Sequence, residues 1–325
     1  MTTSSQSTVL IRSAKAQTLD AIVADILQYY QASSRIHADS RVVIKPNLCS
    51  ESRSKIAHAN TDHRLLECVC RQLKEFTEHV VVGESDGIRA PAELAMEESG
   101  VFELAKTLDL QVVNFSKDRL VDTGHKMLQG FGLPATLLEA DYVVTLPVLK
   151  THALTVFSGA IKNQWGCVPR YDRILLHKYL DQLLCDLNGL LKPSLAIMDG
   201  LICVEGRGPV NGKPREVGAI LASDDLVALD ATAMRLVGLE PRESRHIVLS
   251  HEGGFGQLEE SGITVDGPFD EFACQFEPAV LDWAIRAMNY CTRSSFFTKK
   301  ILMNDRIFQP TKQLVNLSRK IGLVR

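Results

Sequence analysis

The chain has 325 residues, 45% of them apolar, and a formal net charge of −3. A chain of this length forms one large domain or two ordinary ones, and its apolar content excludes a disordered or fibrous protein. A net charge close to zero gives no general attraction for nucleic acid, so we expect no nucleic-acid partner.

The start of the chain and the cysteines indicate the compartment. Residues 1–8 are polar and carry no signal-peptide pattern, and no apolar stretch approaches the roughly 20 residues that span a bilayer. The eight cysteines are scattered, with no C-x-x-C and a single C-x-C at Cys68 and Cys70. We therefore expect a cytoplasmic protein with reduced thiols, no membrane partner and no iron–sulfur cluster.

Strand-like and helix-like segments alternate along the chain. Short β-branched runs predict buried strands at 8–12, 41–45, 79–83, 110–115, 141–146, 195–199 and 217–222. Apolar residues spaced three and four apart predict helices at about 18–33, 62–77, 91–107, 172–191 and 225–238. This alternation is typical of an α/β fold with a doubly wound, mainly parallel sheet and helices on both faces.

The pattern changes after about residue 240. We expect a disordered tail at 1–8, an α/β domain that carries the site at 9–240, and a mostly helical C-terminal region at 241–325. The predicted helices within 277–325 have basic ends. A lid, a contact in a homo-oligomer and a simple buttress are all open as roles for them.

Polar residues follow several of the predicted strands. Ligands of open parallel sheets bind outside the carboxyl ends of the strands, so these residues are candidates for one site. The alternative is that the Asn and Asp residues only cap turns or helices there. The residues that we expect to bind an anionic substrate are Lys45, Asn47, Lys150, Asn163 and Asp199.

The segment 147–169 is the most informative part of the chain. Ser158 and Gly159 precede an apolar turn and predict a helix N-terminus that binds an anion through its backbone. Lys162 lies about one turn further on, beside apolar side chains that would lower its pKa and make it a nucleophile. A lysine that pairs with an anion, or one at the surface, is the alternative. His152, ten residues before Lys162, is the acid–base candidate.

Two further features add candidates. His177 stands four residues before Asp181 on a predicted helix, a spacing that lets a carboxylate orient an imidazole for catalysis or metal binding. A plain surface pair has the same spacing. The segment 199–214 is rich in glycine and proline, and Gly206 and Gly208 there would offer backbone N–H donors to an anion.

Three familiar motifs are absent. The segment 199–214 is not a P-loop, because Arg207 replaces its first glycine and Pro214 replaces its Ser or Thr. No G-x-G-x-x-G follows an early strand, and no G-x-S-x-G occurs.

The segments just described together resemble a known family. IKPN (44–47), GESDG (83–87), KTH (150–152) and SGAIKNQWG (158–166) are similar to the uncharacterised family named domain of unknown function 362, as is most of the chain from about 40 to 240. The K-T-H followed by S-G-x-x-K-N-x-x-G is the most specific part. Some relatives carry a ferredoxin-type cluster, for which this chain has no cysteine pattern.

The chain resembles the nickel-pincer lactate racemases more distantly. Asp86 and Arg89 match their D-x-x-R turn, and His152 and Lys162 match a His that stands ten residues before a Lys. The resemblance implies that Lys162 anchors a pyridinium cofactor, that His152 is a general base and that His177 is a nickel ligand. Asp86 and Arg89 would hold substrate or cofactor.

This chain departs from the racemase pattern at two places. Ala160 stands where the racemases have a second glycine, and the nearest match to their second catalytic histidine, His125, has different surroundings. A nickel-pincer cofactor is therefore one option among several, and the cofactor stays open.

The residues predict an enzyme that acts on a small carboxylate-bearing metabolite. His152 and Lys162 would carry out acid–base or hydride-type chemistry of the isomerase or oxidoreductase class. The alternative is a protein that binds a ligand or cofactor in the same pocket without turning it over.

Overall fold

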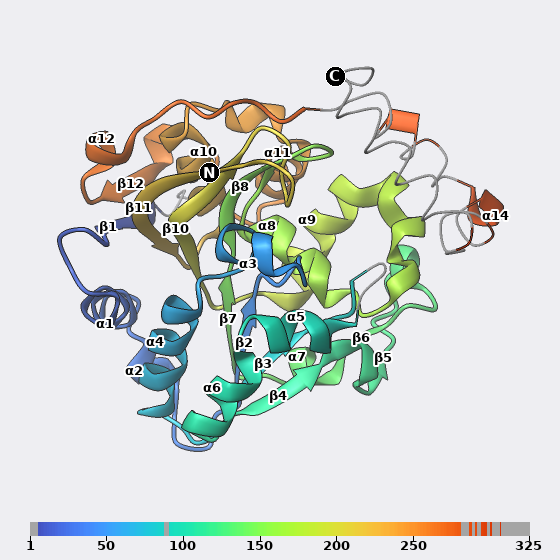
Figure 1. The fold of residues 1–325 in the computed structure, drawn as a ribbon, viewed down its shortest axis with the longest axis horizontal. Coiled ribbons are helices and arrows are strands. Elements are labelled where there is room, and N and C mark those ends of the chain that lie inside the picture. The colour runs from blue at the N-terminus through green and yellow to red at the C-terminus, as the bar shows by residue number, and fades with distance from the viewer. Residues whose placement is uncertain are drawn as a thin grey trace.

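A computed structural model describes residues 6–87 and 91–280, together with the separate positions 286–287, 290, 294–297, 300 and 306. Its main feature is a ten-stranded sheet in the order β12-β1-β11-β10-β7-β2-β3-β4, in which β8 also pairs with β10 and β9 pairs with β8. Helices lie on both sides of this sheet (Figure 1). The α/β class predicted from the sequence is confirmed.

The strands match the predicted runs closely where β-branched residues dominate. The strands of the main sheet are β1 (Ser7–Ser13), β2 (Val42–Pro46), β3 (Val80–Glu84), β4 (Gln111–Asn114), β7 (Tyr142–Leu146), β8 (Val148–His152), β9 (Val156–Ser158), β10 (Leu195–Glu205), β11 (Lys213–Ser223) and β12 (Ile263–Asp266). A separate antiparallel pair joins β5 (Leu120–Val121) to β6 (Leu133–Pro134).

The helices cover both faces because alternate strand residues point to opposite sides. The α-helices are α1 (Leu19–Tyr29), α2 (Ala32–Arg35), α3 (Arg53–Ala59), α4 (His63–Lys74), α5 (Ala92–Glu98), α6 (Val101–Leu108), α7 (Ala135–Leu138), α8 (Ala160–Asn163), α9 (Leu180–Leu191), α10 (Leu226–Leu236), α11 (Arg245–Glu252), α12 (Phe269–Phe272) and α14 (Ser295–Phe297). Short 3₁₀ helices include η3 (Gln164–Cys167) and η4 (Tyr171–Tyr179).

Two hydrophobic clusters flank the sheet. On β2, Val43 belongs to the cluster that holds α8, α9 and α10, and its neighbours Val42 and Ile44 belong to the cluster that holds α1, α4 and α5. Strands buried on both faces read as continuous apolar runs, which is why the sequence identified them.

The parallel part of the sheet contains a topological switch point. The chain runs outward from β2 to β3 and β4, and it then returns to β7 and β10 on the other side of β2. The strand order reverses between β2 and β7, and a crevice opens there beyond the carboxyl ends of the strands. The fold thus predicts the position of a ligand site.

Several predicted boundaries differ from the structure. The predicted helix 172–191 is the 3₁₀ helix η4 followed by α9, and the predicted helix 91–107 is divided into α5 and α6 at Gly100, whose φ is +73°. The strands β8 and β9 were not predicted. They form a hairpin that carries Lys150 and His152.

The structure describes only part of the predicted N-terminal tail and of the predicted C-terminal region. Strand β1 includes Ser7 and Thr8 of the predicted tail, and residues 1–5 lie outside the described residues. Strand β12, from the predicted C-terminal region, pairs with β1 in the main sheet. Most of the predicted helical segment 277–325 lies outside the described residues. Among the residues that the structure does describe, no helix is long and apolar enough to cross a membrane.

Candidate functional site

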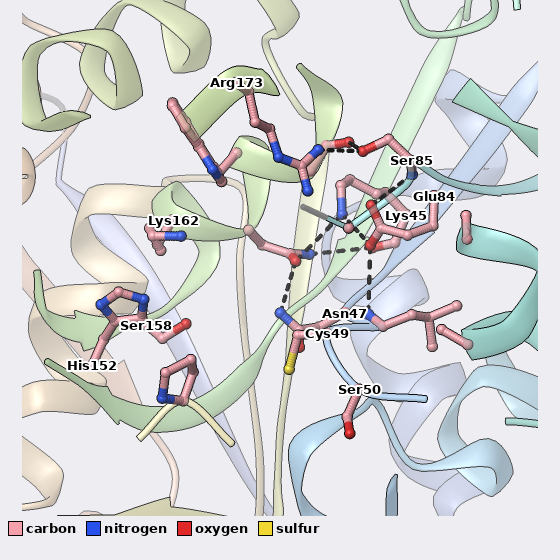
Figure 2. A pocket seen from close by; sticks show the side chains of 18 of the residues that line it. Lys45, Asn47, Cys49, Ser50, Glu84, Ser85, His152, Ser158, Lys162 and Arg173 are labelled. Atoms are coloured by element: carbon pink, nitrogen blue, oxygen red, sulfur yellow. Dashed lines mark hydrogen bonds and ion pairs between the residues drawn. The ribbon is translucent and has the colours of Figure 1, made fainter. Parts of the chain in front are cut away.

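A cavity of about 280 Å³ opens at the switch point, and we call it the central cavity. Its walls come from the ends of β2 and β3, the β8–β9 hairpin, α8 and η4 (Figure 2). The predicted site residues that line it are Lys45, Asn47, Lys150, His152, Ser158, Lys162, Asn163 and His177. Lining residues outside the predicted set of site residues include Cys49, Glu84, Ser85, Trp165 and Arg173.

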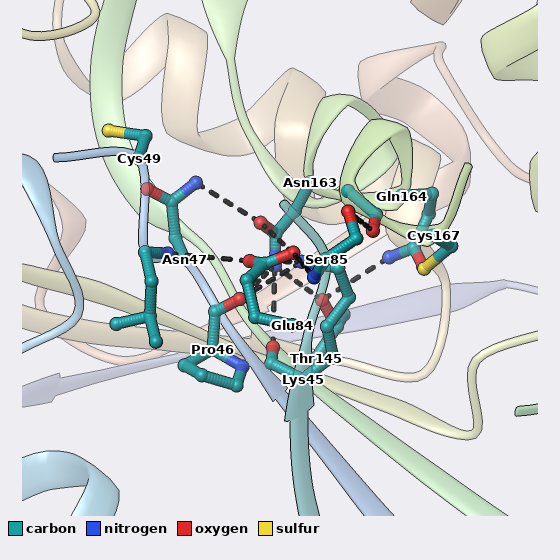
Figure 3. Close-up of polar contacts among 12 residues, drawn as sticks. Lys45, Pro46, Asn47, Cys49, Glu84, Ser85, Thr145, Asn163, Gln164 and Cys167 are labelled. Carbon is teal, nitrogen blue, oxygen red and sulfur yellow. Dashed lines mark hydrogen bonds and ion pairs between the residues drawn. The ribbon is translucent and has the colours of Figure 1, made fainter. Parts of the chain in front are cut away.

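A hydrogen-bonded network forms one wall of the central cavity (Figure 3). Nζ of the buried Lys45 donates to Oε2 of Glu84 at 2.9 Å, and the Asn163 side chain donates to Oγ1 of Thr145 at 2.8 Å. Oδ1 of Asn163 in turn accepts from Nδ2 of Asn47 at 3.1 Å. The network ties β2, β3, β7 and α8 together, so this wall is preorganised.

The first glycine of S-G-x-x-K-N-x-x-G makes room for a buried carboxylate. Asp230 of α10 accepts hydrogen bonds from the backbone amides of Ala160 (2.6 Å) and Ile161 (3.0 Å). A Cβ at Gly159 would overlap Oδ1 of Asp230. The group that occupies this helix N-terminus is therefore the protein's own Asp230, whose pKa burial raises to about 7, and the amides of Ala160 and Ile161 are not free to bind a ligand.

The last glycine of the motif makes room for the ion pair. A Cβ at Gly166 would overlap Oε1 of Glu84 and lie 2.7 Å from Nζ of Lys45. Between the two glycines, Asn163 enters the network and Lys162 faces the cavity. The two glycines of the motif thus have a steric reason, and Asn163 has a polar one.

Lys162 has the electrostatic setting of an acid–base group. Burial, reinforced by the charges of Arg173 and Lys150, lowers the pKa of Lys162 from 10.5 to about 7. Its Nζ lies 5.9 Å from the centre of the Trp165 ring. A lysine with this pKa exchanges a proton near neutral pH.

His152 is held as a neutral imidazole. Its Nδ1 accepts hydrogen bonds from the backbone amides of Leu154 (3.1 Å) and Thr155 (3.3 Å). Burial and the nearby charges of Lys162 and other cations lower the pKa of His152 well below 6.5. The proton of the neutral ring is therefore on Nε2, so Nε2–H is the hydrogen-bond donor of this ring.

His177 does not pair with Asp181 as its spacing predicted. Its ring packs on Trp165 with the ring centres 5.5 Å apart, and the carboxylate of Asp181 lies 3.9 Å from Nδ1 of the buried His246. The two residues are separated by the junction between η4 and α9, so α-helical spacing does not apply. Burial lowers the pKa of His177 to about 3, so its ring is neutral.

Arg173 is the main site residue that sequence reasoning missed. It is 8% exposed, and its Nη1 donates to Oγ of Ser85 (2.5 Å) and to the carbonyl of Val168 (2.8 Å). Its guanidinium extends toward the cavity from above in Figure 2. Arg173 lay inside a segment predicted as an amphipathic helix, where no spacing distinguishes it.

Other predicted residues have partners away from the central cavity. Asp86 caps α5 through the amide of Ala92 at 2.8 Å, and Asp199 accepts from the amides of Asp62 (2.7 Å) and Leu201 (3.0 Å). These bonds match the capping alternative. Arg89 lies outside the described residues.

The glycine-rich loop packs on the hairpin. The amide of Gly206 donates to the carbonyl of Glu277 at 2.9 Å, and a Cβ at Gly208 would overlap the carbonyl oxygen of Thr151. The backbone at these two glycines therefore lies close to other parts of the protein. Pro209 of the same loop lines the cavity. The proposed role of Gly206 and Gly208 as anion donors receives no support from these contacts.

The metal and cofactor assignments stay predictions. Lys162 and His177, the residues that the racemase resemblance assigns to a cofactor, both line the central cavity. Within the described part of the chain, no group of three His, Cys, Asp or Glu residues is placed to hold a metal ion. A nickel ion in the central cavity would therefore need most of its ligands from groups other than the His, Cys, Asp and Glu side chains of the described residues.

Comparisons with known proteins identify relatives of this chain. The model of the family described as "Domain of unknown function (DUF362)" matches residues 42–235. The "Thylakoid-associated protein sll1697" of Synechocystis is 30% identical over 208 residues, which are 62% of this chain and 64% of that protein. The chain therefore spans less than two thirds of the length of this relative.

Two solved structures overlap with this fold at low similarity. The lactate racemase apoprotein of Thermoanaerobacterium thermosaccharolyticum matches with a TM-score of 0.43 and 12% identity, over 68% of this chain and 55% of its own. A Thermotoga maritima protein matches with a TM-score of 0.37 and 12% identity, over 74% and 60%. Scores of this size carry no argument about function.

Proposed function

We propose an enzymatic function for this chain, which belongs to the DUF362 family. In this proposal the protein binds a small carboxylate-bearing metabolite in the central cavity and moves a proton at the carbon next to the carboxylate. The observation that carries the proposal is the juxtaposition of Lys162 and His152 in one cationic cavity (Figure 2).

The charge of the cavity favours an anionic ligand. Three cationic side chains line it (Lys45, Lys150 and Arg173), and Lys162 adds a fourth charge when it is protonated. The two lining carboxylates are Glu84, which is paired with Lys45, and the exposed Glu51. Anions are attracted to such a site, and a low-dielectric wall strengthens the attraction.

Lys162 and His152 supply complementary chemistry. The neutral amine of Lys162 would take the proton as the C–H bond breaks, and the electron pair would move onto the carboxylate oxygens. Nε2–H of His152 would donate a hydrogen bond to the oxygen where this charge develops. Return of the proton to the same carbon, on either face, completes an exchange or an isomerisation without an oxidant.

Deuterium exchange tests this proposal without knowledge of the full reaction. We would incubate the protein in D₂O with a panel of 2-hydroxy and 2-amino acids, and follow deuterium at the carbon next to the carboxylate by mass spectrometry. At least one acid should gain deuterium with the wild-type protein and none with Lys162→Met. Lys178→Met, which removes a lysine that stacks on Tyr179, is the matched control.

The outcomes separate this function from its rival. Exchange that persists in Lys162→Met would refute the role of Lys162. Tight binding of an acid with no exchange in the wild-type protein would instead favour a protein that binds a ligand or cofactor without turnover.

A further inference from the structure

Cations in the central cavity outnumber the carboxylates that could balance them. Lys45 has Glu84 at 2.9 Å. No carboxylate among the described residues lies within ion-pair distance of Lys150, Lys162 or Arg173. Buried cations normally have anionic partners, because an unbalanced buried charge is costly.

Lys150 is the clearest case. It is completely buried, and its ammonium donates to Oδ1 of Asn47 (2.8 Å), the carbonyl of Ala59 (2.7 Å) and Sγ of Cys49 (3.2 Å). These three bonds use all the hydrogens of the ammonium, and none of the three acceptors is a carboxylate. Lys150 would therefore attract an anion through its field and not through a further hydrogen bond.

Arg173 is the second case, on a different wall. Its two hydrogen bonds, to Ser85 and Val168, are to neutral oxygens, and its buried Nε has no hydrogen-bond partner within the described structure. A guanidinium has five N–H donors in a fork that suits carboxylate and phosphate groups. Arg173 thus has unused hydrogen-bond donors although its side chain is nine-tenths buried, and this combination points to a ligand.

The nearby carboxylates of Glu84 and Asp86 act on Arg173 through space, and neither forms an ion pair with it. Glu84 pairs with Lys45, and Oδ1 of Asp86 accepts from Ala92 and Asn114. Glu51 is exposed at the edge of the cavity. Outside the described residues the sequence holds two acidic side chains, Asp282 and Asp305.

We propose that the ligand of the central cavity is a small organic acid with two anionic groups, one near Arg173 and one near Lys150. This inference rests on the proposed function only for the choice of site. A dicarboxylate and a phosphorylated carboxylate share the required chemistry. In both, the second anion balances a charge that one carboxylate would leave unbalanced.

Matched ligands test the inference without any change to the protein. We would measure affinity by calorimetry, at constant ionic strength, for short dicarboxylates, for the half-amide of each, and for phosphoglycolate. The half-amide keeps the shape and removes one charge. At least one dianion should bind about 100-fold more tightly than its singly charged counterpart. Preference for dicarboxylates or for phosphoglycolate identifies which kind of acid the site takes.

Two results would overturn the inference: equal affinity for a diacid and its half-amide throughout the panel, or no binding of any dianion at millimolar concentration. Arg173→Met should abolish most of the charge preference, and Lys178→Met should leave it intact. Because the readout is binding, a dianion preference without deuterium exchange would refute the enzymatic proposal alone. Exchange without a dianion preference would refute this inference alone.

Discussion

The backbone amide of Leu154 donates a hydrogen bond to Nδ1 of His152 at 3.1 Å. The turn of the β8–β9 hairpin thereby fixes the tautomer of an imidazole at the edge of the central cavity. A ring nitrogen that accepts such a bond cannot also take a proton from a ligand. The general-base role that the racemase resemblance implies for His152 therefore fits this geometry less well than the role of a neutral donor.

The substitution His152→Asn tests the donor role. The side-chain oxygen of asparagine can accept from Leu154 and keep the turn, but the side chain is too short to replace Nε2–H in the cavity. We expect a folded protein whose deuterium-exchange kcat falls about 10²- to 10³-fold, as for loss of one donor to a developing oxyanion. Circular dichroism and the exchange assay measure the two effects, and an unchanged kcat would contradict the donor role.

The pH dependence of exchange should report Lys162. The folded-state pKa is about 7, so the neutral amine prevails above that pH. The kcat/KM for exchange should therefore rise with pH through about 7 and then level off. Arg173→Met removes a charge that lowers this pKa, so the rise should move to higher pH. A profile that is flat from pH 6 to 8 would count against Lys162 as the base.

A stability measurement checks the same group without activity. Between about pH 7 and 10.5 the unfolded chain binds a proton at Lys162 that the folded chain does not, so folding stability rises with pH across this window. Lys162→Met should flatten that part of the stability profile, measured by urea denaturation. An identical slope in the variant would show that Lys162 titrates normally in the folded protein.

The fold could be predicted because its signal is local. The run at 41–45 has the β-branched composition of a strand buried on both faces, and it forms β2 almost residue for residue. Strands β8 and β9 escaped prediction because the segment around Lys150 and His152 mixes polar and apolar residues. Their pairing depends on β10, whose partners are distant in the sequence.

The site could be predicted only in part, since its contacts join distant segments. Lys162 and His152 were identified because strand ends and the S-G-x-x-K-N-x-x-G segment point to them. The identity of the anion at Gly159 could not be predicted, because Asp230 follows it by 71 positions and reads as an ordinary helix residue. Arg173 likewise has no distinguishing spacing.

Asp230 should be a positioning residue for Lys162. Its carboxylate satisfies the amides of Ala160 and Ile161, which begin the helix that carries Lys162. Asp230→Ala would leave both buried amides without partners, at a cost of about 2–4 kcal/mol in the free energy of unfolding. Urea denaturation measures this loss.

The same variant separates positioning from stability alone. If Asp230 orients Lys162, the pH at which exchange rises should shift in Asp230→Ala, because the amine then sits in a different environment. Asp225→Ala removes a comparable carboxylate, one that caps α10 through Ala228, and serves as the control. A lower stability with an unshifted pH profile would assign Asp230 a structural role only.

Gly166 should be intolerant of a side chain because of the ion pair beside it. In Gly166→Ala the new methyl group would press on Glu84 and Lys45, both held within the buried network. Displacing packed groups typically costs 1–3 kcal/mol, so we expect a loss of about 3 kcal/mol in urea denaturation once the ion pair is also strained. The decisive comparison places Gly166→Ala in a Lys45→Ala, Glu84→Ala background, which removes the side-chain atoms that a Cβ at position 166 would meet. There the loss should shrink by about 1–2 kcal/mol, since contacting residues are energetically coupled. An equal loss in both backgrounds would mean that something other than the Lys45–Glu84 pair requires glycine at this position.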